Sequence, residues 1–132
     1  MTKKVILMRG KRKRAIARAS VGAGTGKVKI NGQFLDNFSN DMSRLRIKEP
    51  LTLASDVVSK IDVKVNVIGG GMNGQADAIR LAIARALVQH EPKLKKIFED
   101  YDRLLLVADV RRKEVCKPND SKARAKRQKS YR

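Results

Sequence analysis

The placement of charge constrains this chain most, because its surplus of positive charge lies at the two ends. Residues 1–29 carry ten Lys and Arg and no acid, and residues 111–132 carry ten against two acids. Residues 30–110 carry eleven of each sign, so the net charge of +18 belongs to the ends. Since like charges repel, we expect the core to form in the neutral middle and the ends to act as basic arms that meet a polyanion.

Length and composition allow one domain. The chain has 132 residues, and 42% of them are hydrophobic, which is enough for a folded core. We therefore predict a single globular domain over residues 1–110, which starts with a basic strand region, and an extended basic tail over residues 111–132. The segment KPNDSKARAKRQKSYR (117–132) has almost no apolar side chain. We expect it to be disordered in the free protein.

The cysteine count and the length of the apolar runs limit the cellular compartments in which we expect the protein to act. A single cysteine excludes a disulfide framework and a four-ligand zinc site, and it fits a reducing compartment. The longest apolar run, LLLVA at 104–108, is too short to cross a bilayer, and the N-terminus lacks the apolar region of a signal peptide. We expect a cytoplasmic protein with no membrane partner.

Alternation of residue types predicts the strands. Near the N-terminus, Arg14, Ile16 and Arg18 share one face of a strand and three alanines share the other. The Asn31-Gly32 pair is a strong hairpin signal. We predict strands over 14–19, 27–32 and 61–67 and a buried strand over 104–110, and residues 33–38 could add a short return strand.

Helical spacing predicts the remaining elements. Residues 74–89 repeat apolar side chains at helical intervals, and shorter helices are expected over 41–46, from Pro50 onward, and over 92–100. The order β, β, α, β, α, α, β indicates an α+β fold. We predict a two-layer structure, in which a mixed four-stranded sheet carries helices on one face.

Two glycine-rich segments are similar to nucleotide-binding motifs. GAGTGK (22–27) has Val21 where a P-loop needs glycine and Val28 where it needs a hydroxyl, so we expect a turn. GGGMNG (69–74) fits the dinucleotide pattern, but the next predicted strand ends near Asp109, too far away for the ribose-binding acid. Its helix start could still receive an RNA phosphate, so Gly70 and Gly71 are candidates for close backbone approach.

No group of residues suggests catalysis. His90 and Cys116 each lack a neighbouring base or nucleophile at a recognisable spacing. We therefore expect no enzyme, no catalytic residue, no cofactor and no metal site. The basic blocks instead predict binding to RNA phosphates through charge. The candidates are Lys11, Arg12, Lys13, Arg14, Arg18, Arg111, Arg112, Lys113, Lys117, Lys122, Arg124, Lys126 and Arg127.

The segment GGGMNGQADAIRLAIARAL (69–87) resembles the signature of the ninth small-subunit ribosomal protein family. GTGKVKING (24–32) resembles the early hairpin of that family, and DVRRKEVCKPNDSKAR (109–124) resembles its turn into the tail. KSYR (129–132) is similar to the C-terminus of the archaeal and eukaryotic branch. The signature residues are Gly69, Gly70, Gly71, Gly74, Gln75, Ala78, Ala82, Ala84, Arg85, Ala86 and Leu87.

The resemblance implies a fold like the second domain of ribosomal protein S-five, and no catalysis. It implies a structural position in the head of the small subunit, on the 3′ major domain of the rRNA and beside neighbouring head proteins. It also implies that the tail reaches the peptidyl-site tRNA, with Lys129, Ser130, Tyr131 and Arg132 near it. The alternatives are a free basic nucleic-acid-binding protein outside the ribosome and a small dinucleotide-binding enzyme.

Overall fold

A computed structural model describes residues 4–126 and 128, and it contains one mixed sheet with the strand order β1-β2-β5-β3-β4. The strands are β1 (Ile6–Arg12), β2 (Ala15–Ala23), β3 (Val28–Ile30), β4 (Gln33–Phe34) and β5 (Ile61–Ile68). Only β3 and β5 pair in parallel. The α+β class and the mixed sheet are confirmed, but the predicted count of four strands is wrong. The sheet contains β1, which the sequence pattern did not predict, and the short return strand β4, and it lacks the strand expected over 104–110.

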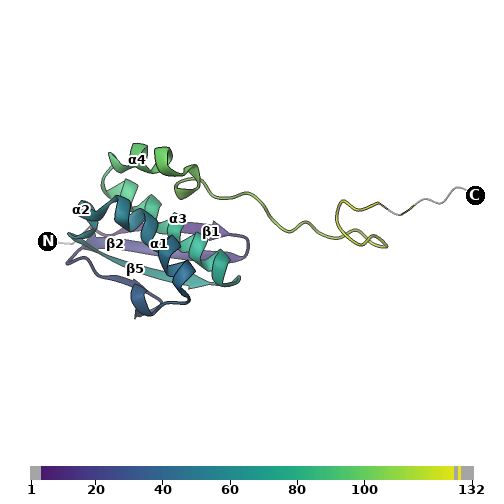
Figure 1. Cartoon of the computed structure of the whole chain (residues 1–132), viewed down its shortest axis with the longest axis horizontal. Helices are drawn as coiled ribbons and strands as arrows, with labels where there is room; N and C mark the ends of the chain where they lie inside the picture. Colours follow the sequence, from purple (N-terminus) through teal and green to yellow (C-terminus); the bar gives the residue numbers. More distant parts are fainter. Residues whose placement is uncertain (1–3, 127, 129–132) are drawn as a thin grey trace, which may run out of the picture.

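The helices lie on one side of this sheet, as Figure 1 shows. They are α1 (Asp41–Leu53), α2 (Ser55–Val58), α3 (Met72–His90) and α4 (Leu94–Tyr101), with short 3-10 turns at Leu35–Asn37 and Arg103–Leu105. Helix α3 packs across β1 and β2, and α1 packs against α3. No helix in the described part of the chain lies on the other side of the sheet, which we call the open face.

Small residues bring α3 close to the sheet. Ala15, Ala17 and Ala19 of β2 are fully or almost fully buried, as their alternation with basic residues predicts. In β1, a methyl group on Gly10 would overlap the carbonyl oxygen of Ala78 and lie 2.7 Å from the backbone nitrogen of Ala82. Two small residues of the signature segment therefore serve the close contact between helix and strand.

The glycine turn before α3 also depends on close packing. Gly69 and Gly70 have φ angles of +75° and +67°, which L side chains rarely adopt. A Cβ at Gly69 would lie 2.6 Å from the carbonyl oxygen of Arg14, and one at Gly70 would lie 2.9 Å from the nitrogen of Ala15. This turn is therefore held against the start of β2.

Two predicted elements differ from the structure. Pro50 does not begin a helix; it is buried inside α1, which runs from Asp41 without a break and ends within one turn after the proline. Residues 104–110 are not a strand, since Arg103–Leu105 forms a 3-10 turn and irregular backbone follows. The Arg85 side chain donates to the carbonyls of Leu106 and Arg9 (both 3.1 Å). A guanidinium group thus joins this segment to edge strand β1 in place of a backbone ladder.

After the 3-10 turn, the chain leaves the helices and extends away from them as the tail (Figure 1). Residues 106–126 contain no helix or strand. In a turn of this segment, the Asp120 N–H donates to the Lys117 carbonyl (3.2 Å) and Asn119 has a φ of 65°. Pro118 precedes Asn119, as is usual in a type II turn. A second backbone hydrogen bond of the same span joins the Ala125 N–H to the Lys122 carbonyl (3.3 Å). The expectation that residues 117–132 are disordered in the free protein stays a prediction.

Candidate nucleic-acid interface

The basic residues from the two ends of the chain meet beside one turn. Lys13 and Arg14 form the two-residue turn between β1 and β2, where Lys13 has a φ of 54°. The Arg112 guanidinium, 99 positions later, donates to the Lys13 carbonyl. The expected N-terminal arm is therefore part of the sheet, and only the C-terminal block is extended. We call the exposed group of Lys13, Arg14, Arg112 and Lys113 the basic junction.

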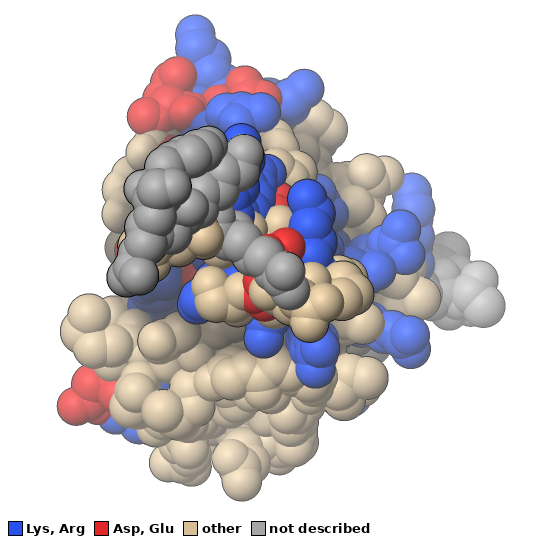
Figure 2. Space-filling view, turned by 90° about the vertical axis from the view of Figure 1, so that its right-hand side faces the viewer, with Lys and Arg blue, Asp and Glu red and all other residues tan. Residues whose placement is uncertain are grey.

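Figure 2 looks onto the end of the molecule from which the tail departs. Lys and Arg side chains gather in the centre and on the right of this view, around the tail and on the side away from the helices. Among the described residues, no ion pair holds Lys13, Arg14, Arg112 or Lys113. These four charges remain available to a polyanion.

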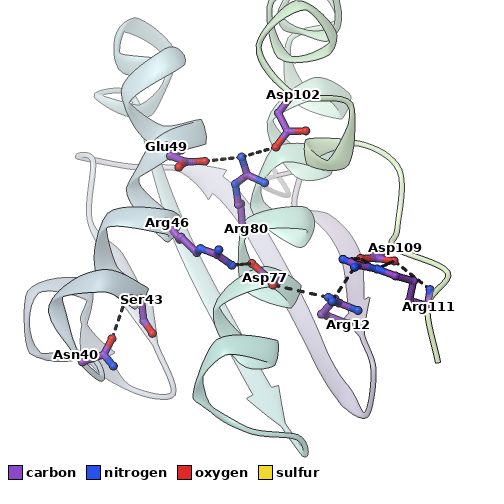
Figure 3. A network of polar contacts seen from close by, with 10 residues as sticks. All are labelled: Arg12, Asn40, Ser43, Arg46, Glu49, Asp77, Arg80, Asp102, Asp109 and Arg111. Carbon is purple, nitrogen blue, oxygen red and sulfur yellow. Dashed lines mark hydrogen bonds and ion pairs between the residues drawn. The ribbon is translucent and has the colours of Figure 1, made fainter. Parts of the chain in front are cut away.

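Arg12 differs from these neighbours because it points into an ion-pair network on the helix side (Figure 3). Its guanidinium lies 3.7 Å from Asp77 and 3.4 Å from Asp109, and only 14% of its side chain is exposed. Arg46 reaches the same Asp77 at 2.6 Å. Arg12 is a predicted RNA-binding residue, but its side chain is largely buried and pairs with two carboxylates, which it shares with Arg46 and Arg111.

Another arginine on the helix side, Arg80, forms a separate group of ion pairs that joins three helical elements. Its guanidinium pairs with Glu49 of α1 and lies 3.0 Å from Asp102, which precedes the last 3-10 turn. Burial favours a higher pKa for Asp102, but hydrogen bonds from the Leu104 N–H and from Arg80 outweigh it, so the pKa is lowered. Because only 12% of the Arg80 side chain is exposed, we infer that its charge stabilises the fold and is not available to an RNA phosphate.

The root of the tail is anchored by Asp109. Its carboxylate accepts hydrogen bonds from the Arg111 side chain, the shortest at 2.7 Å, and from the Arg111 backbone N–H. The Arg111 side chain is the main cause of a pKa for Asp109 well below its usual range, and Arg12 adds to the effect. Asp109 therefore connects β1 to the start of the tail.

The glycine loop at 22–27 cannot cradle a phosphate in this conformation. The N–H groups of Thr25 and Lys27 both donate to one carboxylate oxygen of Asp62, at 2.9 and 3.0 Å. The Gly24 and Gly26 N–H groups donate to the carbonyls of Lys60 and Ile61. The hydrogen bond from Lys27 is the main cause of the lowered pKa of Asp62. The loop is a turn closed by a carboxylate, as its sequence predicts.

Helix α3 begins directly beside the basic junction. A Cβ at Gly71 would have open space around it, and one at Gly74 would lie 3.6 Å from the Arg12 carbonyl. Gly70 adopts the positive φ angle that the turn needs and packs closely on Ala15. The open space around Gly71 leaves the start of α3 accessible. The role of either glycine toward RNA stays a prediction.

The other candidates are distributed more widely. Arg18 is exposed on the open face, and Lys11 is half-buried near the end of β1. In the tail, Lys117, Lys122 and Lys126 are exposed, and Arg124 pairs with Glu114, at 2.5 Å, across the Pro118 turn. That pairing raises the pKa of Arg124. Arg127, Lys129, Ser130, Tyr131 and Arg132 lie outside the described residues.

Sequence comparison identifies the family. The model of the family described as "Ribosomal protein S9/S16" matches residues 10–132. This chain belongs to that family. The small ribosomal subunit protein uS9 of Pyrobaculum aerophilum is 46% identical, with 99% of this chain and 94% of that protein covered. The uS9 proteins of Halobacterium salinarum (47% identical, 93% of this chain and 96% of that protein covered) and Thermoplasma volcanium (48%, with 96% and 98% covered) are similar too.

Within the S9/S16 family member described here, the signature segment is chiefly a packing element. Gln75 donates from its side chain to the Gly69 carbonyl (3.0 Å), Ala78 and Ala82 meet Gly10, and Arg85 joins β1 to the segment before the tail. The resemblance based on this segment is confirmed by the family match. No helix in the described part of the chain is both long and apolar enough to cross a membrane.

Proposed function

We propose that this protein is a structural constituent of the small ribosomal subunit, where it binds rRNA of the 3′ major domain in the head. The observation that carries the proposal is the basic junction, in which four exposed cations from opposite ends of the chain converge without acidic partners. Family membership supports the same assignment, since the relatives are small ribosomal subunit proteins.

The mechanism is electrostatic. RNA helices repel one another when they pack, and Lys and Arg side chains lower that repulsion because they neutralise phosphates. The release of counterions from those phosphates favours binding. Contacts of this kind position a protein on RNA without reading base edges. The ion-pair network keeps the helices and the root of the tail in place, so the junction cations and the tail are presented together. No catalytic step is part of this function.

We further propose that the tail extends to the peptidyl-site tRNA, with residues 129–132 near it. The composition of this segment supports the idea, because Lys and Arg can bind a tRNA backbone and Tyr131 offers one ring for stacking. Sixteen extended residues reach up to about 50 Å. The protein would act in the cytoplasm as part of the ribosome, beside neighbouring proteins of the head.

Density-gradient fractionation of a cell extract tests the assignment. The protein should sediment with the small subunit at moderate salt and leave it at high salt. If it sediments free, or with DNA, the alternative of a free basic nucleic-acid-binding protein replaces the proposal. With about eight phosphates neutralised, the logarithm of affinity for small-subunit rRNA should fall against the logarithm of salt concentration with a slope of roughly −6 to −7.

The role of the junction needs a matched pair of variants. The triple variant Lys13→Gln, Arg14→Gln, Lys113→Gln removes three junction charges, and Lys93→Gln, Lys95→Gln, Lys96→Gln removes three exposed charges near and on α4. The first should weaken rRNA binding far more than the second. For the tail, deletion of residues 129–132 should leave assembly intact and weaken binding of peptidyl-site tRNA. Subunits that bind tRNA like the parent would contradict the tRNA proposal.

A further inference from the structure

A second basic surface lies on the open face of the sheet, opposite the helices. Residues of β1, β2 and β5 alternate between the two faces, and the side that the helices do not cover carries Arg9, Arg18 and Lys64. Lys29 of β3 belongs to the same side, where its ammonium group lies 5.1 Å from the centre of the Phe34 ring. Sequence reasoning singled out only Arg18 among these four cations.

The strand register makes these cations a continuous band. Arg9 is directly opposite Arg18, and Lys29 is directly opposite Lys64. Arg18 and Lys64 are diagonal neighbours on β2 and β5, since Arg18 faces Asn66 and Ser20 faces Lys64. Direct neighbours have Cβ atoms about 5 Å apart and diagonal neighbours about 7–8 Å apart. The cation band therefore runs across four strands and ends on the Phe34 ring.

This arrangement costs stability in the free protein. Like charges placed directly opposite on neighbouring strands destabilise a sheet, and the cation band contains two such pairs. None of its four members forms an ion pair within the described part of the chain. Asp62, the acid on the same face of β5, is already bound by the N–H groups of Thr25 and Lys27. An anion that covers the cation band would relieve this repulsion.

We propose that the open face is a second RNA-binding surface, on which the cation band receives the phosphates of a single RNA segment. A phosphate backbone offers the repeating negative charge that a line of four cations complements. The exposed apolar side chains of this face, Leu7, Phe34 and Ile68, lie on β1, β4 and β5, no two of which are neighbours in the sheet, so they do not form the contiguous apolar centre of a typical protein interface. The inference rests on the proposed rRNA-binding function.

The consequence is a protein that binds two RNA segments at once. The basic junction lies at the turn between β1 and β2, whereas the cation band lies on the broad face of the same hairpin. An RNA segment on the band and another at the junction would approach from different directions. The protein would then act as a spacer that fixes the two segments relative to one another.

Matched charge variants of the full-length protein provide the first test. Arg9→Gln, Arg18→Gln, Lys64→Gln removes three charges of the cation band, and Lys93→Gln, Lys95→Gln, Lys96→Gln serves as the control with the same change in net charge. The salt slope for small-subunit rRNA should fall by roughly 2–3 in the band variant and by less than about 1 in the control. The melting temperature of the band variant should stay equal or rise, so lost binding cannot be ascribed to unfolding.

A tethered cleavage reagent provides the second test, because it reports where the RNA lies. An iron chelate that generates hydroxyl radicals is attached to the native Cys116 in one sample and, in a Cys116→Ser background, to Asn66→Cys on the open face in another. Two distinct sets of rRNA cuts support two RNA segments. Absence of cuts from position 66, or equal salt slopes for the band and control variants, overturns the inference. If the parent protein shows no salt-dependent rRNA binding at all, the proposed function itself fails.

Discussion

The two sides of the sheet use arginine in opposite ways. On the helix side, Arg12, Arg46 and Arg80 are paired with carboxylates from α1, α3 and the segment before the tail. On the open face, Arg9 and Arg18 are exposed, lie next to each other and have no such partners in the described residues. Arg9 and Arg12 lie on one strand, three positions apart, so sequence position alone does not reveal the role of a cation.

This difference shows that the positions of the acidic residues determine which cations form ion pairs within the folded protein. All eleven acids of residues 30–110 lie in the electrically neutral part of the chain, and several of them balance arginines on the helix side. The cations that remain without partners are the ones that a polyanion can neutralise. Changes on the helix side should therefore affect folding, and changes on the open face should affect binding.

The largest effect is expected from Gly10→Ala, which pushes β1 away from α3. The new methyl group would overlap the Ala78 carbonyl, so the free energy of unfolding should fall by about 3 kcal/mol or more. Urea denaturation measures this change. Gly22→Ala is the control, because its Cβ would have only an ordinary contact, at 3.8 Å, with Val5. Equal stability of the two variants would contradict the close packing of α3 on β1.

A smaller loss is expected from Arg80→Gln. The substitution leaves Glu49 and Asp102 close together without their shared cation, which should lower the free energy of unfolding by about 2 kcal/mol. Arg103→Gln removes an exposed charge nearby and should change stability by less than about 0.5 kcal/mol. If both variants unfold at the same urea concentration, the Arg80 ion pairs contribute little to folding.

The glycine turn allows the two kinds of role to be separated at neighbouring positions. Gly70→Ala should destabilise the fold by about 1–3 kcal/mol, because of its positive φ and its contact with Ala15. Gly71→Ala has open space around the new methyl group, so it should leave stability almost unchanged and weaken rRNA binding. Thermal unfolding and filter-binding assays measure the two effects. Unchanged rRNA affinity in Gly71→Ala would remove the helix start from the interface.

A gain in stability is expected from Arg18→Gln on the open face. The variant removes the like-charge pair with Arg9, which should raise the free energy of unfolding by about 0.2–0.5 kcal/mol. Calorimetry at low salt, where screening is weakest, is the appropriate measurement. Lys95→Gln on α4 should show no comparable gain. A loss of stability in Arg18→Gln would mean that Arg18 has a structural partner.

The smallest effect concerns pH and the root of the tail. Since the pKa of Asp109 is lowered in the folded protein, its contribution to stability is present above about pH 4, the value for an unfolded Asp. That contribution is lost as the pH falls toward the folded-state pKa. The protection factor of the Arg111 amide, which is the exchange rate corrected for the intrinsic pH dependence of amide exchange, should fall on acidification from pH 6 to pH 3. Asp109→Asn should show low protection at both pH values; parallel behaviour of the two proteins would contradict the anchoring role.

Local sequence patterns predicted the elements whose conformation is determined by residues close together in the chain. The alternation around Ala17 and the Asn31-Gly32 turn are both confirmed, with φ angles of 51° and 82° in the turn. β1 was not predicted because both of its faces carry cations: Arg9 faces solvent and Arg12 faces distant acids. The apolar run at 104–110 was misinterpreted as a strand, because such a run does not reveal that Arg85 occupies the neighbouring edge.

For the candidate site, the sequence predicted which segments are basic. It did not predict which of their cations form ion pairs within the fold and which remain exposed for binding. Which cations are paired depends on Asp77 and Asp109, whose distance from Arg12 in the chain hides their contact with it. Lys29 and Lys64 were not predicted as binding residues because neither belongs to a run of consecutive basic residues, and only the register of β3 and β5 brings them together. Long-range pairing is the information that local periodicity lacks.

The strand order has a consequence for how the chain folds as it is synthesised. β5 lies between β2 and β3, and the pairing of Ala17 with Val67 joins residues that leave the ribosome far apart in time. Until β5 and α3 have emerged, the first hairpin has an unpaired inner edge and an uncovered alanine face. The nascent chain therefore becomes stable late and nearly in one step, when the signature segment (residues 69–87) packs against strands that were synthesised earlier.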